Sequence, residues 1–160
     1  MGKNRDFDIR FIEKSEWEEA MAMVYRTFLE FDAHMFTQEG IDNFREFISD
    51  TALKHMFENG NFQVIGAYDG RKLIGIIALR ENRHISLLFV EKDYHRLGVG
   101  RKLVQELSDY AYNKLHETLL TVNASPYATE FYHRLGFLDI SPSVSTDGII
   151  FTPMKYILGD

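Results

Sequence analysis

The most informative part of the sequence is LLFVEKDYHRLGVGRKLV, residues 87–104. An apolar run typical of a strand ends at charged residues, passes two glycines, and continues into an apolar pattern of helical period. A turn of this kind leaves backbone N–H groups without partners at the start of a helix, where the helix dipole favours negative charge. Arg96, Arg101 and Lys102 add positive charge at the same place. The stretch therefore predicts a binding site for a phosphate-bearing ligand.

Several kinds of protein carry glycine turns before helices. A dinucleotide fingerprint would need a third glycine at residue 103, which is Leu103 here. A Walker A loop would need Gly-Lys-Ser/Thr, which does not follow Gly100. A glycine turn that only caps a core helix would need no ligand, and another kind of nucleotide-binding loop would bind ATP or NAD. Both of these alternatives stay open on the loop alone.

Length and composition indicate one globular domain over residues 1–160, with 45% hydrophobic and 26% charged residues. The chain has no cysteine, which excludes disulfides, thiolate metal sites and a cysteine nucleophile. The formal net charge of −6 argues against nucleic-acid binding and suits a cationic substrate. Neither a bilayer-length apolar run nor a signal-peptide core is found, so we expect a cytoplasmic protein without a membrane partner.

Hydrophobic periodicity predicts an α/β fold in which a mixed sheet is flanked by helices. The predicted strands cover residues 8–12, 62–68, 72–80, 84–90 and 118–123, a segment from 137 onward, and 149–158. The predicted helices follow Ser15 and Thr37 and cover residues 51–58, 98–115 and 126–135. Ser15 and Glu18 are expected to form a capping box, and residues 141–148 a polar loop.

A second cluster, VNASPYATEFYHRLGF at residues 122–137, follows the phosphate loop. With it the chain resembles the GCN5-related N-acetyltransferase (GNAT) superfamily. The loop is similar to that family's acetyl-CoA signature, Gln/Arg-x-x-Gly-x-Gly/Ala, with His95 in the first place and Gly98 and Gly100 in the others. The later cluster is similar to its second signature, a helix that ends in Phe/Leu-Tyr-x-x-x-Gly-Phe. Together the two motifs cover about a third of the chain, residues 83–137.

The resemblance implies a single-domain GNAT-like fold, in which a central sheet of about seven strands splays so that the pantetheine of acetyl-CoA enters the gap. It implies that backbone groups of Leu88, Phe89 and Val90 pair with the pantetheine like an added strand. A bulge in that strand would leave an N–H free to polarise the thioester carbonyl. The residues implied to surround the pyrophosphate are His95, Arg96, Leu97, Gly98, Val99, Gly100 and Arg101.

Two further residues are candidates for contact with coenzyme A. Ser125 stands where many relatives carry a CoA-contacting asparagine, and Asn123 lies two places earlier. Either side chain could make the contact.

Acyl transfer to an amine needs a neutral nucleophile, stabilisation of the oxyanion, and a proton for the departing thiolate. Tyr132 matches the position of the family's usual general acid, and the alternative is that its ring only packs with Phe131 and Phe137. His84 and Glu81 are candidates for the general base, and the alternative for each is a solvated turn residue. The histidines show no metal-ligand spacing, so acetyl-CoA is the one expected cosubstrate and no metal is expected.

The acceptor is expected to be a small-molecule or protein primary amine, bound by residues 30–39 and 141–148, where the family's substrate-binding segments fall. Glu30, Asp32 and His34 could form an acidic entrance for it, or simply an exposed polar loop. We therefore predict an acetyltransferase that works by direct attack in a ternary complex, as a monomer or a homodimer. The alternative from another class is an acyl-CoA-binding sensor or interaction module without catalysis.

Overall fold

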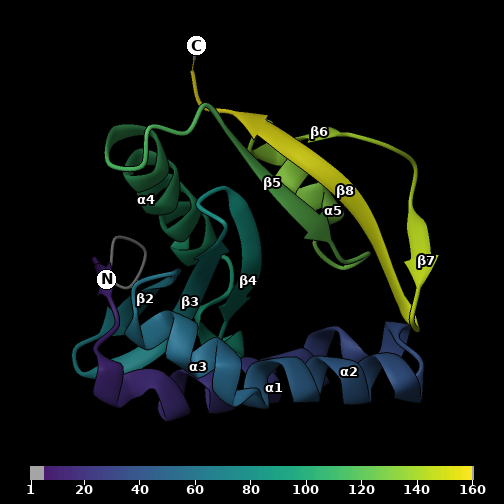
Figure 1. The fold of residues 1–160 in the computed structure, drawn as a ribbon, viewed down its shortest axis with the longest axis horizontal. Coiled ribbons are helices and arrows are strands. Elements are labelled where there is room, and N and C mark those ends of the chain that lie inside the picture. The colour runs from purple at the N-terminus through teal and green to yellow at the C-terminus, as the bar shows by residue number, and fades with distance from the viewer. Residues whose placement is uncertain (1–5, 160) are drawn as a thin grey trace.

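A computed structural model describes residues 6–159, and its centre is a mixed sheet (Figure 1). The strand order is β1-β2-β3-β4-β5-β8-β6, and β7 pairs with β8 beside this path. The strands are β1 (Asp8–Phe11), β2 (Phe62–Asp69), β3 (Lys72–Arg80), β4 (His84–Val90), β5 (Leu119–Ala124), β6 (Leu138–Asp139), β7 (Val144–Thr146) and β8 (Ile149–Ile157). The predicted fold class is confirmed, with eight strands among the described residues rather than about seven.

Within the described residues, five α-helices flank the sheet: α1 (Trp17–Phe31), α2 (Gln38–Ser49), α3 (Thr51–Glu58), α4 (Val99–Asn113) and α5 (Thr129–Arg134). Short 3-10 turns occupy η2 (Lys14–Glu16), η3 (Ala33–Met35) and η4 (Lys92–Tyr94). None of the helices within residues 6–159 combines the length and the apolar character needed to cross a membrane.

The sheet opens between its two neighbouring parallel strands, β4 and β5. They pair only at His84 with Thr121 and at Ile85 with Val122. Beyond these two pairs the strands separate, and β5 continues as the partner of β8 along its whole length. The half of β4 that leads to the phosphate loop therefore has no strand on its β5 side.

A bulge lies in β4 just where this separation begins. Ala78 pairs with Leu87 and Leu79 pairs with Ile85, so Ser86 is an extra residue in β4. The extra residue reverses the side-chain alternation, because Ile85 belongs to the apolar cluster on one face and Leu87 to the cluster on the other. The bulge implied by the family resemblance is present, three residues before Phe89.

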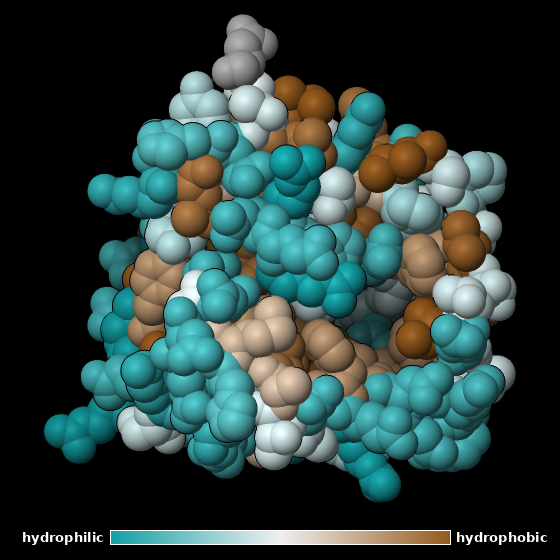
Figure 2. All heavy atoms as spheres, viewed as in Figure 1, coloured by the Kyte–Doolittle hydropathy of each residue, from teal (hydrophilic) through white to brown (hydrophobic). Residues whose placement is uncertain are grey.

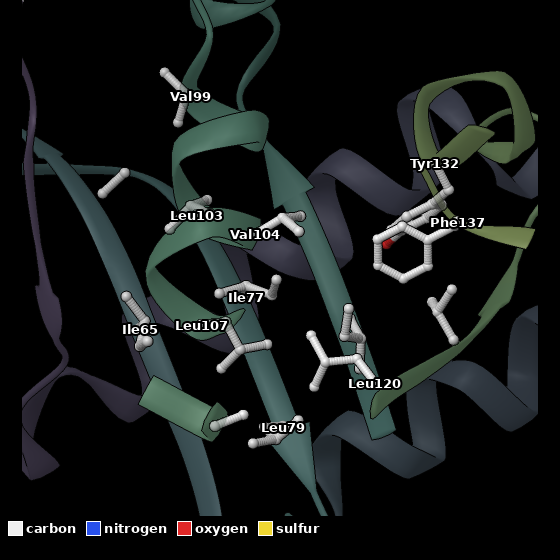
Figure 3. Packing of buried hydrophobic residues seen from close by; sticks show 14 of the residues in the cluster. Ile65, Ile77, Leu79, Val99, Leu103, Val104, Leu107, Leu120, Tyr132 and Phe137 are labelled. Atoms are coloured by element: carbon white, nitrogen blue, oxygen red, sulfur yellow. The ribbon is translucent and has the colours of Figure 1, made fainter. Parts of the chain in front are cut away.

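Each face of the sheet carries its own apolar core. On one face, the stripe Val99, Leu103, Val104 and Leu107 of α4 lies over Ile65, Ile77 and Leu79 (Figure 3). On the other face, α1, α2 and α3 contribute Val24, Ile48 and Leu53 among others. Helix α4 is thereby held at the end of β4, which fixes the loop between them.

Three local predictions were wrong. Ser15 does not cap α1, because the cap lies one turn earlier, where the Glu13 N–H donates to the Glu16 carboxylate at 2.8 Å. Residues 141–148 are not only loop, since Val144–Thr146 forms β7 against β8. In addition, α5 begins at Thr129 rather than at Pro126, because residues 126–128 form a turn.

The tip of the β7–β8 hairpin is joined to the start of α2. The Thr37 N–H donates to the Gly148 carbonyl at 3.2 Å, and Asn43 Nδ2 donates to the Asp147 carbonyl at 3.5 Å. A Cβ at Gly40 would collide with the Gly148 backbone, so glycine is required for this close approach. The two segments expected to bind the acceptor, residues 30–39 and 141–148, are therefore neighbours.

Candidate active site

The phosphate loop presents a continuous set of backbone donors. Gly98 has a φ of +81° and Arg96 a φ of +65°, so the chain turns twice through the left-handed region before α4. Among the described residues, no acceptor is found for the backbone N–H groups from Arg96 to Arg101. The Lys102 N–H is the first to be paired, with the Gly98 carbonyl at 3.0 Å. This geometry fits an anionic group of pyrophosphate size.

His95 does not point its ring at this set of donors. Its Nε2 donates to the Val90 carbonyl at 2.7 Å, and its ring centroid lies 4.7 Å from that of Phe31. The side chain thus joins the end of β4 to the end of α1. A contact between His95 and coenzyme A through the backbone is compatible with this position.

The strand residues predicted to hold the pantetheine line the opening. Leu88, Phe89 and Val90 are half-buried and lie in the part of β4 that β5 does not cover. Leu88 and Val90 pack toward α4, whereas Phe89 packs toward Phe44 of α2, with ring centroids 5.9 Å apart. The backbone edge that faces the gap is therefore available to an extended ligand.

Tyr132 is buried, with 3% of its surface exposed, and it lies on the α5 side of the gap. Its ring packs edge-on against Phe131 and Phe137, at centroid distances of 5.2 and 5.0 Å. Figure 3 shows the ring beside Phe137, with its hydroxyl directed away from α5 toward the neighbouring strand of the sheet. Burial raises the pKa of Tyr132, and the negative charge of Asp32 raises it further. The group is neutral at pH 7 and can donate a proton.

Asn123 and Ser125 occupy different environments. Asn123 is exposed on β5, opposite Pro153 of β8. Ser125 follows the end of β5 and is half-buried, and its Oγ donates to Oδ1 of Asp32 at 3.4 Å. Ser125 therefore links the turn after β5 to the end of α1 across the opening.

Asp32 was predicted only as part of a possible acidic entrance, and its burial and its contact with Ser125 come from the structure. It follows α1 directly, at the end of the helix where the dipole disfavours a negative charge. Burial raises the pKa of its carboxyl to about 6, although the Ser125 hydrogen bond and nearby His34 both act in the opposite direction. One sequence signal could have identified it, namely an aspartate next to Phe31 and Ala33 at the C-terminus of an apolar helix.

The two predicted bases lie at the other end of β4. His84 begins the strand and Val90 ends it, so about 20 Å separates His84 from the phosphate loop. The His84 Nδ1 is hydrogen-bonded to Thr121 Oγ1 at 2.8 Å, and burial together with the Arg80 charge lowers the pKa of its ring. Glu81 is exposed in the turn before it, with a φ of +54°. No hydrogen bond or ring contact between described residues connects either side chain with Tyr132.

The space-filling view shows this face of the molecule hollowed between α2 and β8 (Figure 2). The hairpin tip and the start of α2 meet at one end of this hollow, through the Thr37 to Gly148 bond. The acceptor segments predicted from the sequence therefore border it.

The carboxyl of Asp32 gives a stability prediction. Because its pKa rises from 3.8 to about 6 on folding, the native state holds more protons than the unfolded state between these values. The free energy of unfolding therefore falls as pH rises from 4 to 6. We expect Asp32→Asn to increase it by about 1–3 kcal/mol above pH 7, with no difference below pH 4. Urea unfolding at pH 4 and pH 8 measures this, and Asp109→Asn, at an exposed position of α4, is the matched control.

The observed architecture defines a class, an α/β protein whose sheet opens between two parallel strands and whose loop at the start of α4 carries unpaired backbone donors. Residues 32–158 match the sequence profile of the acetyltransferase (GNAT) domain. The chain therefore belongs to the GNAT acetyltransferase family. A search of curated protein sequences finds no match.

Solved structures with the same fold include several acetyltransferases. A GCN5-related N-acetyltransferase from Rhodopseudomonas palustris is 22% identical, with a TM-score of 0.81 and 96% of each chain covered. The PaiA N-acetyltransferase from Thermoplasma acidophilum, in complex with coenzyme A, is 18% identical, with a TM-score of 0.76 and coverage of 96% of this chain and 99% of that one. A chimera of the spermidine N-acetyltransferase SpeG from Vibrio cholerae and hSSAT is 15% identical, with a TM-score of 0.67 and 96% of each chain covered.

Proposed function

We propose that the protein is an N-acetyltransferase that moves the acetyl group of acetyl-CoA to a primary amine by direct attack in a ternary complex. The observation that carries this proposal is the run of free backbone N–H groups from Arg96 to Arg101, in the loop that follows the unpaired half of β4. A pyrophosphate bound there directs the rest of the ligand along β4, toward the gap that Tyr132 faces. The relative from Thermoplasma acidophilum, which binds coenzyme A, supports the same choice of ligand.

Different residues of this chain bind the cosubstrate, orient it and donate a proton. Acetyl-CoA supplies an activated acyl group as a thioester. The loop amides hold its phosphates, and the free edge of β4 orients its pantetheine beside the bulge at Ser86. Tyr132 donates a proton to the departing sulfur; the intrinsic pKa values of a thiol and a tyrosine are comparable, although burial makes the Tyr132 hydroxyl the weaker acid of the two. The roles of His84 and Glu81 as bases stay predictions.

An amine acceptor agrees with the charge of the protein. The formal net charge is −6, and the carboxylate of Asp32 lies at the opening. Spermidine, the substrate named for the Vibrio cholerae relative, is one amine of this kind. Small polyamines, aminoglycosides, amino acids and protein amino termini all belong to the class we propose.

Ligand-induced stabilisation tests the choice of cosubstrate. A ligand at 100 times its Kd adds about 2.7 kcal/mol to the free energy of unfolding. For a chain of this size, that raises the Tm by about 5–10 °C. We expect this shift with acetyl-CoA and with CoA. ATP or NAD giving the larger shift would contradict the proposal and favour a nucleotide-binding protein.

A further inference from the structure

The side chain of Asp32 is a partly buried carboxylate that forms no ion pair within residues 6–159, although His34 is nearby. It makes one side-chain hydrogen bond among the described residues, from Ser125 Oγ at 3.4 Å. The end of α1 adds the negative end of the helix dipole to the same place. A carboxylate in these conditions is destabilised unless a cation binds to it.

Asp32 lies close to the groups that we assign to the transfer reaction. Ser125, its hydrogen-bond partner, follows β5 directly, and Tyr132, on which its charge acts, belongs to α5. The residue before it, Phe31, packs against His95 of the phosphate loop and against Tyr127, with centroids 4.7 and 5.5 Å apart. Asp32 is therefore next to the phosphate loop, through its neighbour Phe31, and close enough to the proposed proton donor Tyr132 for its charge to act on it.

We propose that Asp32 binds the ammonium group of the acceptor and takes the proton that this group must lose before it attacks. The proposal rests on the acetyl transfer proposed above and adds the residue that prepares the nucleophile. Neither Glu81 nor His84 has a comparable link to Tyr132.

The protons and electrons of the step balance as follows. Asp32 takes one proton from R–NH3+, which frees the nitrogen lone pair to form the C–N bond as the C–S bond of the thioester breaks. Tyr132 protonates the sulfur and regains a proton from the nitrogen, which keeps one hydrogen in the amide. Asp32 releases its proton to water, so the products are the amide, the free thiol and one H+.

Titration of Asp32 governs the acidic side of the pH profile. The groups that face it are His34 from η3, Ser125 after β5 and Tyr132 from α5, and Phe31 brings His95 nearby. Activity is expected to rise with pH as the carboxyl ionises near pH 6. Because the Ser125 hydrogen bond lowers the pKa of Asp32, Ser125→Ala is expected to move this rise to higher pH.

Two amines of different basicity separate proton removal from simple binding. n-Butylamine is an ammonium ion at pH 7.5, whereas 2,2,2-trifluoroethylamine is already mostly neutral. We expect Asp32→Asn to lower kcat/KM at least 100-fold with n-butylamine and less than tenfold with trifluoroethylamine. Asp32→Glu should recover part of the n-butylamine activity, and Asp109→Asn should leave both reactions unchanged. Acetyl-CoA affinity and the Tm are measured for each variant.

Three results would overturn this inference: full activity of Asp32→Asn with n-butylamine, an equal loss with both amines, and a pH profile that Ser125→Ala leaves in place. A wild type that does not bind acetyl-CoA, or that binds it and acetylates no primary amine, would instead contradict the proposed function. The two proposals therefore fail in different measurements.

Discussion

Gly98→Asp is expected to lower the affinity for acetyl-CoA about 100-fold. A Cβ at Gly98 meets no atom within 4 Å, so the new side chain has room, and aspartate tolerates the φ of +81° better than most residues. Its carboxylate lies beside the free N–H groups that we assign to the pyrophosphate. At about 5 Å and an effective dielectric constant near 20, two unit charges repel by about 3 kcal/mol, which corresponds to that loss. Isothermal titration of acetyl-CoA measures it directly.

Gly98→Asn is the matched control, because it has the same shape and backbone demands without the charge. We expect it to weaken binding less than tenfold. A second control is Gly70→Asp, which places the same charge at the tip of the β2–β3 hairpin, where φ is also positive and the space is open. Equal losses for Gly98→Asp and Gly98→Asn would show that shape and not charge matters, and would argue against an anion at this loop.

Tyr132→Phe is expected to lower kcat about 100- to 10,000-fold, the range typical of a lost general acid. The ring contacts with Phe131 and Phe137 survive this change, so the core around α5 is retained. The hydroxyl has no hydrogen-bond partner among the described residues, so its removal should leave the Tm unchanged or slightly higher. Acetyl-CoA affinity should also be retained.

The comparison needed is between steady-state turnover and binding in the same variant. Tyr156→Phe serves as the control, because Tyr156 also stacks on Phe137, at 4.9 Å, but comes from β8. A Tyr132→Phe variant that turns over like the wild type would limit Tyr132 to the packing role considered in the sequence analysis.

The elements around the phosphate loop could be predicted because they depend on local pattern. The four-residue repeat of Val99, Leu103 and Leu107 follows from helix geometry, and each of these side chains is buried. Gly98 takes the positive φ that a turn before a helix often requires. The splay of the sheet was implied only by the family resemblance, because it depends on where β4 and β5, distant in sequence, stop pairing.

Other features could not be predicted because their causes are not local. The role that we propose for Asp32 depends on its contact with Ser125, 93 residues further along the chain, and on the burial that the two segments create together. Strand β7 was missed because Val144–Thr146 is a short, exposed and polar segment, which pairs only because β8 supplies a partner. The capping box was displaced because Glu16, which accepts a bond from the Tyr68 hydroxyl at 3.0 Å, caps the earlier turn instead.

We propose that the protein transfers an acetyl group from acetyl-CoA to a primary amine. The most direct test is to incubate it with acetyl-CoA and a broad library of primary amines, and to measure both free thiol and acetylated amine by mass spectrometry. We expect equal amounts of the two products with at least one amine, and the loss of both in Tyr132→Phe. Tight binding of acetyl-CoA without product from any amine would contradict this proposal and identify a non-catalytic acyl-CoA-binding module.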